Sequence, residues 1–241
     1  MLKNCPECGR AVSEYAPICP NCGLPMSMFE KASKVVKTYP SNGVDLGLPS
    51  GTIWSSCNVG AKSAYDVGLY FAWGDLQIKD KYTWENYRYF LGYIKDDFHT
   101  LPRLSKYVSH SRLGIVDDKS YLEPSDDPAT QFMGQQWCTP SHEQSDEIWR
   151  YCKISKVEEK GISGYRVIGP NGNSLFFANS GYLRGDKKLS PESPYLWLNR
   201  ANFCGWENAT CFLFVKNYGG NIATTSPDRF CGLPIRPVLK T

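Results

Sequence analysis

The sequence Val44-Asp-Leu-Gly-Leu-Pro-Ser-Gly-Thr-Ile-Trp54 joins turn residues to a short apolar run, and this pattern recurs through most of the chain. Short runs of aromatic and β-branched residues alternate with Gly, Pro, Asn and Ser, which is typical of strands connected by turns. We therefore expect strands at residues 51–54, 68–71, 164–168, 174–177 and 211–215.

Helix signals are fewer than strand signals. Residues 140–152 predict a helix, because Ser141 can cap its first turn and the pattern continues to Ile148 and Trp149. A second, short helix is expected near residues 126–132, whereas the long segment 76–128 shows no clear periodicity and predicts mainly loops. Many short strands with few helices predict an α+β fold.

Several long motifs of this chain resemble those of one known family. Residues 44–54, followed by Cys57-Asn-Val-Gly60 and Gly68-Leu-Tyr-Phe-Ala-Trp-Gly74, resemble the opening of the Fibrobacter succinogenes major paralogous domain, which is common in Bacteroidetes proteins. The resemblance covers about residues 39–239 and implies a C-type-lectin-like fold, of the variety related to formylglycine-generating enzymes and to the variable proteins of diversity-generating retroelements. Further matching segments are Tyr82-Thr-Trp-Glu-Asn-Tyr87, Trp137-Cys-Thr-Pro140, Gly169-Pro-Asn-Gly-Asn-Ser174, Gly181-Tyr182 and Gly232-Leu-Pro-Ile-Arg-Pro-Val238.

The resemblance also implies a ligand-binding surface in the C-terminal segment, residues 193–231. In the retroelement variable proteins that this segment resembles, adenine-directed mutagenesis changes surface residues while the scaffold stays fixed. Such a site needs a rigid backbone, because the ordering of a loose one would oppose binding by every variant. For the apolar residues Phe203, Leu213 and Phe230, burial in the core at strand positions is the alternative. The expected ligand-binding residues are Leu198, Asn199, Arg200, Asn202, Phe203, Cys204, Thr210, Cys211, Leu213, Phe230 and Cys231.

Two CPxCG motifs lie near the first residue, at Cys5-Pro-Glu-Cys8-Gly9 and Cys19-Pro-Asn-Cys22-Gly23. Two residues between the cysteines let both sulfurs face one ion, and the following glycine lets backbone N–H groups approach the thiolates. We expect Cys5, Cys8, Cys19 and Cys22 to hold one structural Zn²⁺, since four sulfur ligands leave no position for a catalytic water. Two disulfides, or an ordinary core role for the cysteines, are the alternatives.

The chain is therefore expected to contain two domains joined by a linker. Residues 1–27 form the zinc ribbon, residues 28–38 a short helical or extended linker, and residues 39–241 the C-type-lectin-like domain that binds the ligand. The ribbon needs its metal, because so short a segment cannot fold by burying a core. The second domain has ample apolar material, since 41% of the 241 residues are hydrophobic.

The charge balance and the targeting signals restrict the kinds of partner and the cellular compartment that we expect for this chain. The 27 basic and 24 acidic residues leave a net charge of +3, without the basic excess of a dedicated nucleic-acid binder. The start of the chain has no apolar export signal, and no apolar run is long enough to span a bilayer. We expect a soluble, cytoplasmic protein that binds another protein and no membrane. Nucleic-acid binding through the ribbon stays open, and the oligomeric state is undetermined.

An enzyme is not expected, because no set of nucleophile, base and orienting residue can be assembled from the sequence. The resemblance to formylglycine-generating enzymes leaves one enzymatic alternative, in which Cys204, Cys211 and Cys231 include a copper-handling pair. A nucleic-acid-associated regulator acting through the ribbon is the other alternative. Calcium binding is not expected, since the segment 206–208 lacks a companion Glu-Pro-Asn or Gln-Pro-Asp tripeptide.

Overall fold

A computed structural model describes residues 2–5, 10–22, 26, 43–95, 100–201, 207–214 and 222–239. Contacts between residues divide the chain into two compact units, Met1–Tyr39 and Pro40–Thr241. The expected linker, residues 28–38, lies outside the described residues. Within the described ranges, no helix combines the length and the apolar composition needed to cross a bilayer.

The first unit contains a two-stranded antiparallel hairpin. Strand β1 (Leu2–Asn4) pairs with β2 (Ala11–Ser13), with Leu2 opposite Ser13. The buried cluster found in the described part of this unit consists of Cys5, Val12 and Cys19. Among the described residues of this unit, these three small side chains exclude too little water to stabilise a fold by themselves.

A four-stranded sheet joins the two ends of the second unit to its middle. Strand β16 (Val238–Leu239) lies between β4 (Ile53–Ser55) and β7 (Trp137–Cys138), and β3 (Gly43–Asp45) completes the order β3-β4-β16-β7. Val238 lies opposite both Trp54 and Cys138. The last strand of the chain is therefore an inner strand of this sheet, which fixes the end of the second unit.

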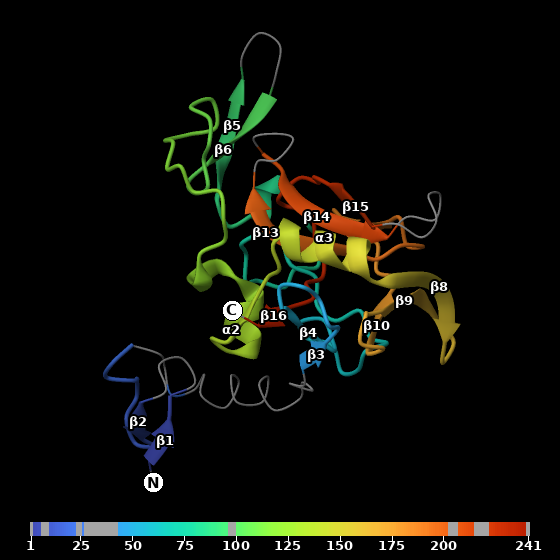
Figure 1. Cartoon of the computed structure of the whole chain (residues 1–241). Coiled ribbons are helices and arrows are strands. Elements are labelled where there is room, and N and C mark those ends of the chain that lie inside the picture. Colours follow the sequence, from blue (N-terminus) through green and yellow to red (C-terminus); the bar gives the residue numbers. More distant parts are fainter. Residues whose placement is uncertain are drawn as a thin grey trace. The chain divides into compact units, whose positions relative to one another are not determined.

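Two antiparallel sheets of three strands form most of the remaining framework. The first has the order β10-β9-β8, and the second has the order β13-β14-β15. Helix α3 (His142–Tyr151) contacts all three strands of the second sheet and lies across it (Figure 1). The strands are β8 (Lys153–Glu159), β9 (Ile162–Ile168), β10 (Ser174–Ala178), β13 (Tyr195–Ala201), β14 (Ala209–Phe214) and β15 (Ile222–Thr225).

Helix α3 begins at the residue that the sequence predicts. Ser141 Oγ accepts a hydrogen bond from the backbone N–H of Gln144 at 3.3 Å, and Gln144 Oε1 accepts one from the backbone N–H of Ser141 at 2.9 Å. This reciprocal pair satisfies two N–H groups that the first turn cannot satisfy itself. The predicted helix at residues 140–152 is confirmed. Helix α2 (Pro128–Met133), capped by Asp127, confirms the short one expected near residues 126–132.

The segment 76–128 contains a hairpin that the lack of periodicity did not predict. Strands β5 (Phe90–Lys95) and β6 (Thr100–Leu104) pair with each other, and the hairpin extends away from the rest of the second unit (Figure 1). The other short elements are the 3-10 helices η1 (Trp84–Asn86) and η2 (Pro124–Asp126), and a second hairpin of β11 (Tyr182–Arg184) and β12 (Lys187–Leu189).

Four of the expected strands are present, as β4, β9, β10 and β14, and residue 215 lies outside the described residues. The strand expected at residues 68–71 is wrong, since only Phe71 forms an isolated bridge, with Leu233. Leu69 instead donates its backbone N–H to the carbonyl of Val59, so the segment has no continuous partner strand. The α+β class is confirmed, whereas the C-type-lectin-like fold stays a prediction.

Arg236 is a fully buried cation that ties the last segment to two sheets. Its guanidinium donates to Asn58 Oδ1 at 2.7 Å, to the carbonyl of Ser55 at 3.2 Å and to the carbonyl of Phe176 at 3.0 Å. Burial lowers the pKa of Arg236 to about 10, which still leaves it protonated at neutral pH. A buried charge is tolerated only when its donors are satisfied, and here carbonyl and amide oxygens satisfy them.

Candidate metal centre and recognition surface

Three cysteines of the first unit converge on one point. The Sγ atoms of Cys5, Cys19 and Cys22 lie within 4.8 Å of one another, and those of Cys5 and Cys22 are 3.5 Å apart. A tetrahedral Zn²⁺ with Zn–S bonds of about 2.3 Å places its sulfurs about 3.8 Å apart. The separations therefore fit a group that can hold one metal ion, and thiolate donors suit zinc.

The hairpin positions these cysteines. Cys5 follows β1 directly, and its backbone N–H donates to the carbonyl of Arg10 at 2.8 Å, which closes the loop carrying the first CPxCG motif. Cys19 and Cys22 come from the second motif. Cys8, the fourth expected ligand, lies outside the described residues. The structure thus brings together the three expected ligands that it describes, and the identity of the metal stays a prediction.

The C-terminal segment is buried more deeply than the sequence predicted. At most 8% of the side chain is exposed in six of the expected ligand-binding residues, and the prediction that these six lie on a surface is wrong. Three others, Asn202, Phe203 and Cys204, lie outside the described residues. The six buried residues are Leu198, Thr210, Cys211, Leu213, Phe230 and Cys231.

The reason for this burial is that the β13-β14-β15 sheet separates two apolar clusters. Successive side chains of a strand point to opposite faces. Cys211 packs in the cluster around Trp73, whereas Phe212 and Phe214 pack in the cluster around Trp54. Since both faces of β14 are covered, all six of its residues are buried, and alternation along the strand leaves no exposed row.

Side chains at the end of this sheet do reach the surface. Arg200 forms an isolated antiparallel bridge with Tyr121, and its guanidinium carbon lies 5.8 Å from the centre of the Tyr121 ring, which is 53% exposed. On the opposite edge strand of the sheet, β15, Thr224 Oγ1 lies 3.4 Å from Nδ1 of His142, the first residue of α3. We call Tyr121, His142, Glu143, Arg200 and Thr224 the strand-end face.

The charges of the strand-end face influence one another. The pKa of Glu143 lies below its ordinary value of 4.5, first because of a hydrogen bond with Ser141, and further because of the positive charges of His142 and Arg200. Asn199, the neighbour of Arg200, is half-buried, and its backbone N–H donates to the carbonyl of Pro140 at 2.9 Å. This bond fastens the end of β13 to the start of α3. Asn199 and Arg200 are thus the two expected ligand-binding residues that the structure leaves partly exposed.

The buried cysteines of this segment are poorly suited to catalysis. Burial raises the pKa of Cys231 from 9.0 to about 12, and burial together with the nearby Cys231 raises the pKa of Cys211 well above its ordinary value. Both are therefore protonated at neutral pH, and a thiol is a far weaker nucleophile and metal ligand than a thiolate. Cys204 lies outside the described residues.

The adjacent acids Asp126 and Asp127 take separate partners. Asp126 accepts a hydrogen bond from Tyr107 Oη at 2.7 Å and forms an ion pair with Lys106, whereas Asp127 accepts from Thr139 Oγ1 at 2.6 Å. They do not face a common site, so they are not arranged as a pair of acid and base. Their partners belong to the fold itself.

Sequence reasoning missed four of the five residues of the strand-end face. Tyr121, the adjacent pair His142 and Glu143, and Thr224 come from three segments that are far apart along the chain, and no local spacing marks these segments as neighbours. The cap at Ser141 predicts where α3 begins, but it does not predict which strands the helix crosses. Only the pairing of β13, β14 and β15 brings these side chains together.

No protein-family model matches this chain, and no curated protein or solved structure matches it either. The family resemblance described above therefore stays a prediction from the motifs. Arguments about function rest on the geometry of the two candidate sites.

Proposed function

We propose that this chain is a non-enzymatic binding protein, in which a zinc-stabilised ribbon precedes a C-type-lectin-like domain that recognises another protein. The strand-end face is the recognition surface. The observation that carries this proposal is the position of the face at the end of a sheet whose central strand is wholly buried. Such a backbone keeps its place when surface side chains change, so little ordering entropy opposes binding.

The composition of the strand-end face suits a protein partner. Arginine and tyrosine are enriched among the residues that dominate protein interfaces, and Arg200 lies against Tyr121. The contact between them fixes two otherwise mobile side chains before binding, which reduces the entropy lost in the complex. The protonated state of Cys211 and Cys231 supports a binding role over the enzymatic alternative, because neither is activated as a nucleophile.

Affinity capture with the full chain tests this proposal. Wild-type protein and an Arg200→Ala/Tyr121→Ala variant are used to capture partners from a lysate of the source cells, and Lys153→Ala serves as the control, because Lys153 is an exposed residue of β8. We expect one partner to be retained by the wild type and the control and lost by the double variant. A partner retained equally by all three proteins would contradict the assignment of the surface.

The alternative of a nucleic-acid-associated regulator makes a different prediction. Binding through phosphate contacts weakens steeply as salt rises, because counterions are released. The near balance of charge, +3 for 27 basic and 24 acidic residues, supports the protein partner. A steep salt dependence of binding to DNA or RNA, abolished by Cys19→Ser, would favour the regulator instead.

Diversification by a retroelement is a separate part of this proposal. It requires a reverse transcriptase gene near the coding sequence, together with a near-copy of the codons for residues 193–238 that differs at adenines. Sequencing of the neighbouring DNA tests it directly. Without both elements, the recognition surface would be a fixed one.

A further inference from the structure

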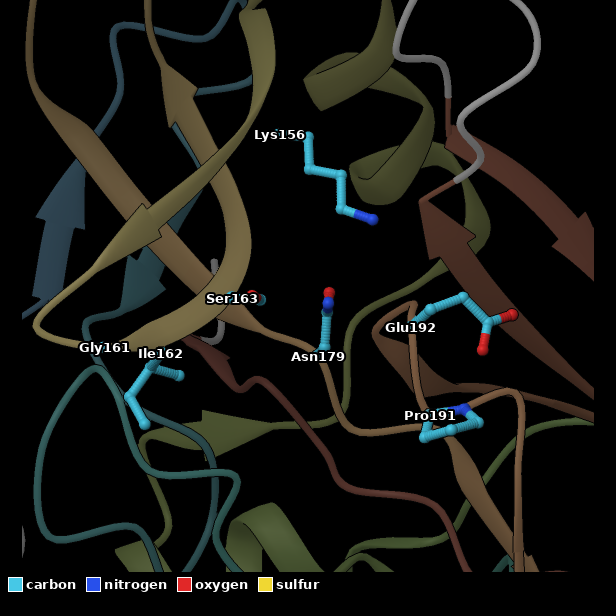
Figure 2. Close-up of a pocket in the computed structure, with 7 residues that line it drawn as sticks. All are labelled: Lys156, Gly161, Ile162, Ser163, Asn179, Pro191 and Glu192. Atoms are coloured by element: carbon cyan, nitrogen blue, oxygen red, sulfur yellow. The ribbon is translucent and has the colours of Figure 1, made fainter.

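A groove with a cavity volume of about 480 Å³ lies at one end of the β10-β9-β8 sheet. Small-molecule sites typically have volumes of about 300–1,000 Å³, so this groove has the size of one. It shares no residue with the strand-end face, and it is open to solvent. Its walls include Lys156, Ile162, Ser163, Asn179, Pro191 and Glu192 (Figure 2).

The groove forms where the core-facing side of this sheet ends. Lys156, Tyr165 and Phe177 are successive cross-strand partners, so their side chains share one face of the sheet. Tyr165 and Phe177 are buried, whereas Lys156 is exposed. In the next row, the backbone N–H of Asn179 donates to the carbonyl of Ser163 at 3.0 Å. The face therefore changes from apolar to polar at the groove.

Two polar groups of the groove lack partners in the part of the chain that the structure describes. Asn179 Oδ1 is buried and accepts no hydrogen bond from any described residue. It is the one such buried atom whose residue also lines the groove, within the described residues. Lys156 likewise has no hydrogen bond or ion pair with a described residue. Only Asn179 Oδ1 is buried, since Lys156 is exposed. A buried polar atom without a partner is rare in folded proteins, so Asn179 Oδ1 calls for a physical explanation.

The two groups converge. Figure 2 shows the ammonium group of Lys156 and the amide of Asn179 pointing into the same space from different sides of the groove. The carboxylate of Glu192 points away from Asn179. Ile162, which is 40% exposed, and Pro191 add apolar surface at the rim. A ligand here meets the cation of Lys156, the buried acceptor Asn179 Oδ1, the carboxylate of Glu192 at the rim and an apolar wall.

We propose that this groove binds a small carboxylate with a hydrogen-bond donor on the neighbouring carbon, that is, an α-amino or α-hydroxy carboxylate. The ligand carboxylate binds Lys156 Nζ, its amino or hydroxyl group donates to Asn179 Oδ1, and an apolar side chain packs on Ile162 and Pro191. The negative charge of Glu192 at the rim disfavours a second carboxylate. This site goes beyond the proposed recognition of a protein and does not depend on it.

Isothermal titration of the full chain with four probes tests the proposal. Leucine and its hydroxy analogue, leucic acid, supply both recognised groups, whereas isocaproate lacks the donor and leucinamide lacks the carboxylate. We expect leucine or leucic acid to bind, and the comparison of the two distinguishes an amino from a hydroxy ligand. Isocaproate and leucinamide should each bind at least about tenfold more weakly, since each loses one charge-assisted hydrogen bond.

Substitutions at matched positions locate the binding. Lys156→Met should weaken binding of the carboxylate probes at least about tenfold, whereas Lys153→Met, which removes the same charge from the other face of β8, should leave it unchanged. Asn179→Ala should abolish the preference for leucine or leucic acid over isocaproate. Lys156 is exposed, so its variant is expected to fold, which circular dichroism checks. No binding of any probe at millimolar concentration, or equal binding by Lys156→Met, would overturn the proposal.

Discussion

The indole N–H of Trp197 donates to the backbone carbonyl of Phe71 at a donor–acceptor distance of 2.7 Å, across 126 positions of sequence. A second hydrogen bond joins the same two segments in the opposite direction: the indole N–H of Trp73 donates to the backbone carbonyl of Leu198 at 2.8 Å. All four residues are almost completely buried. The segment containing Phe71 and Trp73 is thereby fixed against β13, although it forms no strand of its own.

Substitution of Trp197 by Phe should destabilise the second unit. The carbonyl of Phe71 would stay buried without its donor, which costs about 1–3 kcal/mol in the free energy of unfolding. Urea denaturation followed by circular dichroism measures this loss. Trp149→Phe is the matched control, since Trp149 is 44% exposed and its substitution should change stability by less than about 0.5 kcal/mol. Equal effects of the two changes would contradict the role of this hydrogen bond.

Removal of the metal should unfold the first unit selectively. The described part of that unit has only a small buried cluster, so we expect the free energy of metal binding to supply most of the unit's stability. We expect a strong chelator, or Cys19→Ser, to expose residues 10–22 to proteases while the thermal transition of the second unit stays unchanged. Metal content by atomic emission should fall in Cys19→Ser but not in Cys152→Ser. Full metal content in Cys19→Ser would show that the cluster is not the site.

Asp126 and Asp127 should affect acid stability in opposite directions. Burial alone would raise the pKa of Asp126, but hydrogen bonds from Lys106 and Tyr107 outweigh it, so its pKa lies below the ordinary value of 3.8. Asp126 therefore contributes stability that is present above pH 3.8 and lost as the pH falls through its folded pKa. Burial raises the pKa of Asp127 despite the hydrogen bonds from Thr139, so stability is lost as the pH rises from 3.8 to its folded pKa.

Two amide variants separate these contributions. Asp126→Asn should make the free energy of unfolding rise less steeply with pH in the acid range, and Asp127→Asn should make it rise more steeply. Urea titrations at a series of acid pH values measure both slopes. Slopes that change in the same direction would contradict the opposite pKa shifts.

The thiols of Cys211 and Cys231 should resist alkylation in the folded protein. Both are buried and their pKa values are raised, that of Cys231 to about 12, so little thiolate is present at neutral pH. We expect iodoacetamide to label them only after unfolding, as followed by peptide mass spectrometry. Metal-free Cys22, which is exposed, is the internal reference for a reactive site. Rapid labelling of Cys231 in the native chain would contradict this prediction and favour the enzymatic alternative.

Predictions of secondary structure from the sequence were confirmed where one segment of the chain contains all the interacting groups. The cap of α3 depends on Ser141 and Gln144, which are three positions apart, and the strands β9 and β10 follow from their own apolar runs. The segment that contains Phe71 shows where prediction from a local pattern fails. Its apolar run resembles a strand, but the partners of its backbone groups come from separate parts of the chain, which no local pattern contains.

The sequence by itself determined the spacing of the first-unit cysteines, the start of α3 and the α+β class, because these features depend on groups that are close together along the chain. Tertiary structure alone decided which side chains reach solvent. Thr210, Cys211 and Leu213 were expected on a displayed surface, but apolar clusters cover both faces of their strand. Burial depends on what packs against a strand, and here the covering residues lie far away in sequence. The strand-end face and the groove at Lys156 arise where that covering ends.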